Sequence, residues 1–131
     1  MILYKVNISS VGNGWTDEKS TEGEVTEADG AVIIRYTLDG DECVLTVNGN
    51  TVTQERRGEQ CVKISFKEGE STQCVIGSGG LSGSYEIFTR SINFFLGKGG
   101  YKLSLEYLNG SEKEPIKLLL TAVKKGNCYE N

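Results

Sequence analysis

The sequence predicts an all-β protein, and within that class an antiparallel up-and-down β-barrel of about eight to ten strands. Two observations carry this prediction: apolar residues recur at every second position along most of the 131 residues, and glycine-containing turns separate the alternating runs. Such alternation places one row of side chains on each face of a strand, and no stretch shows the stripe of an amphipathic helix. Consecutive hairpins favour a barrel over a sandwich, because a sandwich usually needs longer crossovers between its sheets.

The alternating runs give the expected strands in chain order. They span residues 1–9, 20–28, 31–38, 43–48, 51–57, 61–67, 71–76, 83–90, 91–96, 100–108 and 115–124. The runs 83–90 and 91–96 are contiguous and can form one strand, which reduces the eleven ranges to ten, the upper end of the nine or ten strands that we expect. Residues 11–19 are expected to form the longest irregular connection near the start of the chain.

The early strands carry β-branched and aromatic residues at the alternating positions, as a half-buried pleated surface favours. In residues 2–9 the even positions hold Ile, Tyr, Val and Ile, and in 32–38 they hold Val, Ile, Tyr and Leu. In 43–47 the odd positions hold Cys, Leu and Val. An Asp-Gly dipeptide at 39–40 and an Asn-Gly dipeptide at 48–49 separate these runs. Asn-Gly supplies the positive φ angles of a tight hairpin turn.

The later strands follow the same pattern of apolar or β-branched residues at every second position. The clearest runs are 62–66, 72–76, 92–96 and 101–107. An Asn-Gly dipeptide at 109–110 marks the turn before the last strand. Pro115, the single proline, lies where that strand begins, a position at which its missing N–H does least harm.

Length and composition predict a single domain over residues 1–131. A chain of this length buries roughly two-thirds of the surface that its unfolded form exposes, so it can build a core without cross-links. The apolar fraction of 37% and the charged fraction of 24% are ordinary for a globular protein. No apolar run is long enough for a membrane span, and the first residues lack the pattern of a signal peptide. We therefore expect a cytoplasmic protein with no membrane partner.

The net charge of −4 is unevenly spread along the chain. Residues 1–42 hold nine acidic and three basic side chains, a net −6, whereas residues 43–131 hold eleven basic and nine acidic ones, a net +2. Neither part has the dense basic stripe that drives binding to nucleic acid. We expect no nucleic-acid partner, and a monomer or a weak homodimer.

The four cysteines, Cys43, Cys61, Cys74 and Cys128, have no Cys-x-x-Cys spacing, and the chain has no histidine. The close ligand spacing of a zinc site is therefore absent, and we expect no metal and no other cofactor. Reduced thiols are expected, with Cys43 and Cys74 acting as small apolar core residues.

The sequence contains few of the residue combinations that enzymes use for catalysis. Without histidine there is no Ser-His or Cys-His pair, although a carboxylate pair or a lysine base is possible in principle. The acidic residues lie mainly in turns and at polar strand positions, where solvated faces are the default. Asp39, Asp41 and Glu42 can also hold a hard cation, but the EF-hand pattern is missing. We expect a protein that is not an enzyme.

Seven segments occur in an order and spacing that cover nearly the whole chain. They are 21–24 (Thr-Glu-Gly-Glu), 30–36, Arg57-Gly58, 66–69 (Phe-Lys-Glu-Gly), 83–89 (Gly-Ser-Tyr-Glu-Ile-Phe-Thr), 100–107 and Asn109-Gly110. Together they make the chain resemble the YwiB-like family of bacterial proteins of unknown function. The resemblance implies a calycin-like (lipocalin-like) barrel and supplies no catalytic or ligand residues. The chain departs from the family turn Thr-Pro-aromatic-Gly at 77–83, and the Gly-x-Trp signature of lipocalins is absent because Trp15 follows Gly14 directly.

The glycine-rich stretch 77–83 also invites comparison with phosphate-binding loops. A dinucleotide fingerprint that starts at Gly77 needs its third glycine at position 82, which is serine, and no helix is predicted after it. We expect a flexible turn or a bulge here.

Tyrosines and arginines supply the candidate ligand-binding residues. They are Tyr36, Tyr85, Tyr101, Tyr107, Arg35 and Arg90. The four tyrosines lie in the apolar rows; the two arginines lie in the opposite rows and become anion partners only if they point inward. A barrel of about eight strands is filled by its side chains or holds one small ligand. A buried tyrosine hydroxyl needs a partner. We expect a small apolar or amphipathic ligand in the lumen, or at its mouth beside 77–83 and 97–100.

The alternative is a protein–protein interaction module whose core is completely packed. Trp15, Phe88 and Phe95 lie outside the clean alternation. Exposed together, they form an apolar patch that can bind a partner or a second copy of the chain.

Overall fold

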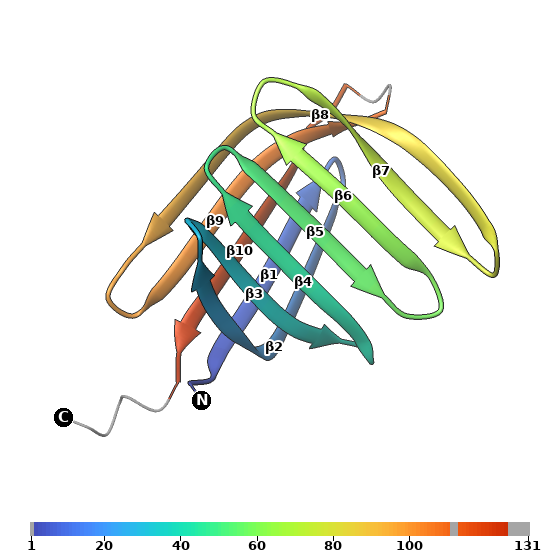
Figure 1. Ribbon diagram of the computed structural model, residues 1–131. Helices are drawn as coiled ribbons and strands as arrows, with labels where there is room; N and C mark the ends of the chain where they lie inside the picture. Colours follow the sequence, from blue (N-terminus) through green and yellow to red (C-terminus); the bar gives the residue numbers. More distant parts are fainter. Residues whose placement is uncertain (1, 111–112, 126–131) are drawn as a thin grey trace.

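Ten antiparallel strands close into one barrel in the structure, a computed structural model that describes residues 2–110 and 113–125 (Figure 1). Each strand pairs with its neighbours in sequence, and β1 pairs with β10 to close the sheet. The strands are β1 (Tyr4–Gly12), β2 (Trp15–Ala28), β3 (Ala31–Leu38), β4 (Asp41–Asn48), β5 (Thr51–Arg57), β6 (Cys61–Lys67), β7 (Ser71–Ser78), β8 (Leu81–Leu96), β9 (Gly100–Asn109) and β10 (Ile116–Lys124). The predicted all-β up-and-down barrel is confirmed, with ten strands.

Short turns with left-handed residues join the hairpins, as the dipeptides in the sequence predict. Asp39 and Gly40 have φ angles of 50° and 85°. In the stretch 77–83 only Gly79 and Gly80 form the turn, with φ angles of 58° and 84°. Two positive φ angles in a row are those of a type I′ hairpin turn, whose twist matches that of the flanking strands. The predicted flexible turn is therefore a tight two-residue turn, and the rest of the stretch belongs to β7 and β8.

The prediction of an irregular connection at residues 11–19 is wrong. β1 continues to Gly12 and β2 begins at Trp15, so only Asn13 and Gly14 form a turn there. Gly14, with φ of 81°, supplies the left-handed conformation that this turn needs. The first residues of β2 are exposed to solvent. Since no face of this segment is buried, the apolar alternation that marks the other strands is missing from the sequence here.

β8 is one continuous strand of sixteen residues across both predicted runs, and it contains a bulge. The pairing with β9 shifts between Thr89 and Ser91, so Arg90 is the additional residue. The bulge changes the inward positions from odd numbers, such as Ile87, to even numbers, such as Phe94. This change of face explains why the aromatic residues of β8 do not follow a single alternation.

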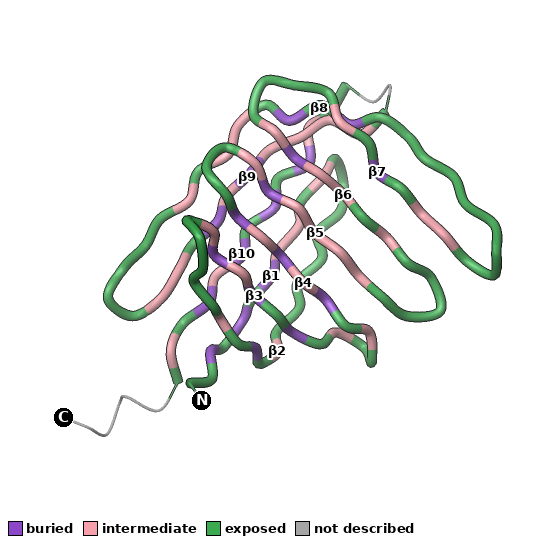
Figure 2. The backbone as a smooth tube through the Cα atoms, in the orientation of Figure 1, coloured by how far each residue is buried: buried purple, intermediate pink, exposed green. Residues whose placement is uncertain are grey.

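One cluster of buried side chains forms the core on the inner face of the sheet. Figure 2 shows in purple the positions of the buried residues along the strands. The least exposed large members of the cluster are Phe66, Ile34, Leu45, Ile87, Leu103, Leu105 and Leu120. Cys43 and Cys74 are buried with them, as predicted, whereas Cys61 is exposed and Cys128 lies outside the described residues. In the part of the chain that the structure describes, no helix is long and apolar enough to cross a membrane.

Candidate functional site

The hairpin registers place inward-facing side chains in rows that run across β3 to β8. Residues directly opposite each other in antiparallel strands point to the same face. The first row, nearest the β5–β6 and β7–β8 turns, is Tyr36, Cys43, Arg56, Val62, Ile76 and Gly83. The second row is Ile34, Leu45, Gln54, Ile64, Cys74 and Tyr85. We call the part of the barrel interior lined by these two rows the mouth; Figure 1 shows the β5–β6 and β7–β8 hairpins extending beyond the rest of the sheet at this end.

On β6 to β8 the inner face of the sheet is buried in the middle of the barrel and partly uncovered at the mouth, whereas the mouth residues of β3 and β4, such as Tyr36 and Cys43, are buried. In the next row, Val52 and Phe66 are at most 1% exposed. In the mouth, Val62 and Ile76 are only half-buried, and Tyr85 is 39% exposed. The mouth therefore presents apolar surface that nothing in the described chain covers completely.

Gly83 leaves an open position on the inner face of the sheet at the mouth, and we call this position the recess. A Cβ atom built on Gly83 meets no other atom within 4 Å, so the space where an inward side chain would lie is open. Gly83 lies opposite Ile76 of β7, and the next inward residue of β8 is Tyr85. An apolar and an aromatic side chain thus flank an unfilled position on the inner face.

A group of charged side chains lies around Arg56, three strands from Gly83 in the first row. The Arg56 Nε donates to the Asp41 Oδ2 at 2.7 Å, and the Arg56 Nη2 lies 3.8 Å from the Asp39 Oδ2. The Lys19 Nζ is 3.6 Å from the same Asp39 oxygen. Gly58 makes room for this arrangement, because a Cβ there would lie 2.0 Å from the Asp41 Oδ1. The two basic and two acidic groups balance, and the guanidinium of Arg56 keeps N–H groups that neither carboxylate engages.

Tyr36 and Gln54 add a neutral polar pair to the mouth. The Gln54 Nε2 donates to the Tyr36 Oη at 3.3 Å, which leaves the tyrosine hydrogen free to be donated elsewhere. Burial, with a smaller effect from Cys43, raises the pKa of Tyr36 to about 12, although Gln54 and Arg56 oppose the rise. Tyr36 is therefore a protonated hydrogen-bond donor at neutral pH. Burial likewise raises the pKa of the Cys43 thiol, so this sulfur is not an activated nucleophile.

The second row ends at Tyr85, which lies over the Cys74 thiol. Hydrogen bonding with Cys74, together with burial, raises the pKa of Tyr85 to about 12, and Tyr107 contributes further. The Tyr107 ring packs edge-on against Phe66, with centroids 5.1 Å apart. Thr89, paired with Tyr107 across β8 and β9, is completely buried, and no described group bonds to its Oγ1.

The structure places the predicted tyrosines in three locations. Tyr36 and Tyr85 lie in the mouth, and Tyr107 faces the core from β9. Tyr101 instead lies near the β8–β9 turn, at the opposite end of the barrel. Its hydroxyl bonds to Glu27, which is the main cause of its raised pKa, and its ring packs against Phe94 with centroids 6.1 Å apart.

Both predicted arginines lie on the outer face of the barrel. The Arg90 Nη1 is 3.2 Å from the Glu106 Oε2, and the Arg90 side chain is 51% exposed. Arg35 is exposed in a groove of about 450 Å³ that Glu24 and Glu42 also line. An arginine can bind an anion in the lumen only if it points inward. Arg35 and Arg90 do not point inward, whereas Arg56 does. The alternation Val52, Gln54, Arg56 is the sequence signal that identifies it.

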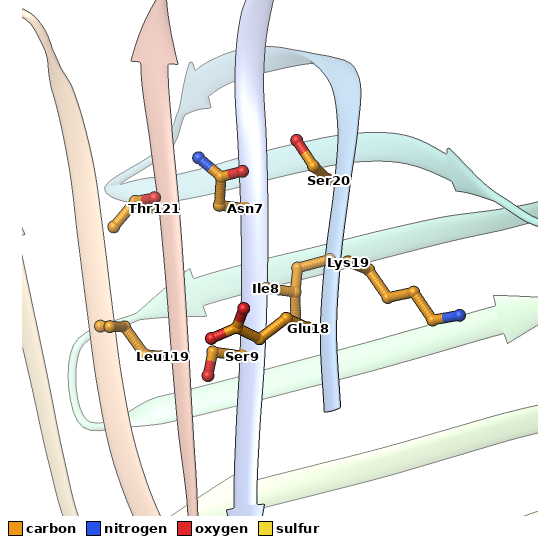
Figure 3. Close-up of a pocket in the computed structure, with 8 residues that line it drawn as sticks. All are labelled: Asn7, Ile8, Ser9, Glu18, Lys19, Ser20, Leu119 and Thr121. Carbon is orange, nitrogen blue, oxygen red and sulfur yellow. The ribbon is translucent and has the colours of Figure 1, made fainter. Parts of the chain in front are cut away.

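Another hollow, of about 410 Å³, lies on the outer surface of β10, β1 and β2 (Figure 3). Short polar side chains such as Asn7, Ser9 and Ser20 line most of it, with Leu119 at one side. It contains none of the predicted ligand residues and no cluster of buried polar groups. Among the described residues, no group of His, Cys, Asp or Glu side chains could hold a metal ion.

Fold and site together define a small antiparallel β-barrel with a packed interior and an open mouth at one end. The chain belongs to the family described as Domain of unknown function (DUF1934), which it matches over residues 3–117. The ywiB protein from Bacillus subtilis has the same fold, with a TM-score of 0.79 and 18% sequence identity over 95% of this chain and 92% of that chain. The resemblance to the YwiB-like family is confirmed, and at this identity the structural likeness shows the fold alone. No curated protein matches the sequence.

Proposed function

We propose that this protein is a non-catalytic binding protein that holds a small amphipathic molecule in its mouth. The observation that carries the proposal is the open recess at Gly83, next to the half-buried Ile76 and the partly exposed Tyr85. Apolar surface that is left uncovered favours an apolar ligand, because covering it removes that surface from water.

The polar end of the ligand is proposed to meet the Tyr36 hydroxyl and the unengaged N–H groups of Arg56. Both groups lie in the first row with Val62 and Ile76, so one molecule in the recess can contact polar and apolar partners together. Arg56 stays bonded to Asp41, so the ligand is proposed to add to this ion pair and not to replace it.

Two observations support binding without chemistry. The pKa of Cys43 is raised, which keeps the thiol protonated, and the pKa of Tyr36 is raised, which keeps its hydroxyl a donor. Neither group is prepared to act as a nucleophile or a base near neutral pH. The cytoplasm remains our proposed location, in keeping with the free thiols of Cys43, Cys61 and Cys74.

Filling the recess tests the proposal. Gly83→Val places a branched side chain in the open space, and Ser84→Val places the same side chain on the outer face of the same strand as a matched control. We expect the amphipathic dye 1-anilinonaphthalene-8-sulfonate to bind the original protein and Ser84→Val with similar affinity, and Gly83→Val at least tenfold more weakly. Equal binding by all three proteins, each with an unchanged far-ultraviolet circular dichroism spectrum, contradicts a ligand in this recess.

The second candidate function is binding of a protein partner, and an outer apolar patch favours it. Phe95 of β8 and Val123 of β10, both on the outer face, are 58% and 49% exposed, and Leu96 at the end of β8 is 66% exposed. They border a hollow of about 410 Å³ next to the β8–β9 turn. Trp15 lies at the β1–β2 hairpin, at the opposite end of the barrel, so it is not part of this patch. Phe95→Ser is expected to weaken any complex that depends on this surface, as sedimentation velocity measures.

A further inference from the structure

The first residues of β8 form an open sheet edge in an otherwise closed barrel. β8 pairs with β7 from Leu81 onward, but its pairing with β9 begins only at Ile87. The Gly110 N–H donates to the Glu86 carbonyl oxygen, and between Leu81 and Tyr85 no described residue pairs with this edge. Figure 1 shows the β7–β8 hairpin reaching beyond β9.

The hairpin register identifies the backbone groups on this edge. The two-residue turn is closed by the pair Ser78–Leu81, so Leu81, Gly83 and Tyr85 direct their N–H and C=O groups toward β7. Ser82 and Ser84 then direct theirs away from β7, to the side on which the Glu86 carbonyl bonds to Gly110 at the end of β9. Unpaired backbone groups in a row are a template for a further strand.

This edge lacks the features by which proteins usually protect exposed strands. Residues Leu81 to Tyr85 contain no charged side chain and no proline, and the edge is not covered by the described chain. Leu81 is 80% exposed and Tyr85 is 39% exposed, both on the inner face of the hairpin. An edge of this kind is suited to pairing with another strand of compatible register.

We propose that this edge pairs antiparallel with the same edge of a second copy of the chain, in a two-fold symmetric dimer centred on Gly83. In this register Ser82 of each copy lies opposite Ser84 of the other, and these two residues carry the outward backbone groups. Leu81 of each copy lies opposite Tyr85 of the other at a pair without hydrogen bonds, where cross-strand side chains approach most closely. The edge is thus complementary to itself, as a symmetric interface requires.

The charged residues near the edge are compatible with a second copy of the chain as the partner. Glu86, the first acidic residue after the edge, lies opposite the uncharged Gly80 of the other copy in this register, so like charges do not meet. The contact is limited to about five residues from each chain, which is far smaller than a standard interface, so the dimer is weak and depends on concentration. It leaves the first-row groups Tyr36 and Arg56 free, and it joins the inner faces of the two β7–β8 hairpins.

Sedimentation equilibrium with the full chain tests this dimer. For the original protein we expect an average mass that rises toward twice the chain mass as the concentration approaches about 1 mM. Ser84→Pro removes one edge N–H per chain without touching the ladder to β7, and edge positions tolerate proline. We expect this variant to remain monomeric with an unchanged thermal midpoint, and Leu81→Lys to do the same by placing a charge against Tyr85.

Phe95→Ser provides the control at the other end of the barrel, and it should dimerise like the original protein. A strictly monomeric original protein at about 1 mM overturns the proposal. So does an unchanged dimer in folded Ser84→Pro, or a dimer that Phe95→Ser alone abolishes. The dye titration with Gly83→Val is measured at micromolar protein, a concentration at which the weak dimer does not form. The proposed ligand site and the proposed dimer can therefore be refuted independently of each other.

Discussion

Two inward-facing glycines, Gly23 and Gly83, are expected to respond in opposite ways to the same substitution. At Gly23 a Cβ would lie 2.4 Å from the Arg35 carbonyl oxygen and 3.1 Å from both the Tyr36 Cβ and the Val6 Cγ2. At Gly83 a Cβ would meet nothing within 4 Å. The first contact involves backbone, which cannot rotate away, so β2 or β3 must shift to accept alanine at position 23.

The magnitude follows from two opposing terms. Alanine is favoured over glycine in a strand by about 0.5–1 kcal/mol, because the unfolded chain loses less freedom on folding. Crowding in a packed interior costs about 1–3 kcal/mol. Gly83→Ala has only the first term and stabilises the protein slightly, whereas Gly23→Ala has both. The free energies of unfolding of the two variants should therefore differ by about 1–3 kcal/mol.

Urea unfolding followed by far-ultraviolet circular dichroism measures this difference. With a slope of about 2 kcal/mol per molar urea, the two midpoints should lie about 1 M apart, with Gly23→Ala lower than the original protein. A loss of stability in Gly83→Ala as large as that in Gly23→Ala refutes the open recess at Gly83, on which the proposed site depends.

Three further predictions concern the core and the charged groups. Phe66→Ala should cost about 3–5 kcal/mol in urea unfolding, because Phe66 is 1% exposed; a cost below about 1 kcal/mol would show that the interior is loosely packed. The pKa of Tyr36 is raised to about 12 in the folded protein, against 10.0 in the unfolded chain. Between pH 10 and pH 12 the unfolded chain loses this proton while the folded protein keeps it, so the free energy of unfolding falls as the pH rises through this range. Tyr36→Phe should make that fall shallower, and an identical pH profile contradicts the assignment. Gly58→Ala should displace the Asp41 carboxylate from Arg56 and cost about 1 kcal/mol, whereas Ser84→Ala on an exposed face should cost nothing measurable.

The sequence predicts most of the barrel because burial and turn geometry leave direct marks on it. Apolar residues at every second position mark the strands that face the core, and the left-handed residues Gly40, Gly49 and Gly110 mark turns. Segment 11–19 escaped prediction since both faces of its strands are solvated, which removes the alternation. The bulge at Arg90 also escaped prediction, because one additional residue in a long strand has no distinctive composition.

The candidate site is predictable only in part. Tyr36 and Tyr85 follow from their places in the apolar rows, but Arg56 requires the alternation to be extended from Val52 along β5. The open edge at Leu81–Tyr85 depends on where β9 joins β8, which is a matter of strand stagger around the whole barrel. Stagger is set by the closure of the complete sheet and not by any single segment. The binding of a small ligand by the barrel remains a prediction.

Amide chemical-shift mapping during titration with 1-anilinonaphthalene-8-sulfonate tests the central claim, binding in the mouth, most directly. We expect saturable chemical-shift changes that are largest at the amides of Arg56, Val62 and Gly83 and small at the amide of Val123. Saturable shifts centred on Val123 and Phe95, or none at all, contradict it.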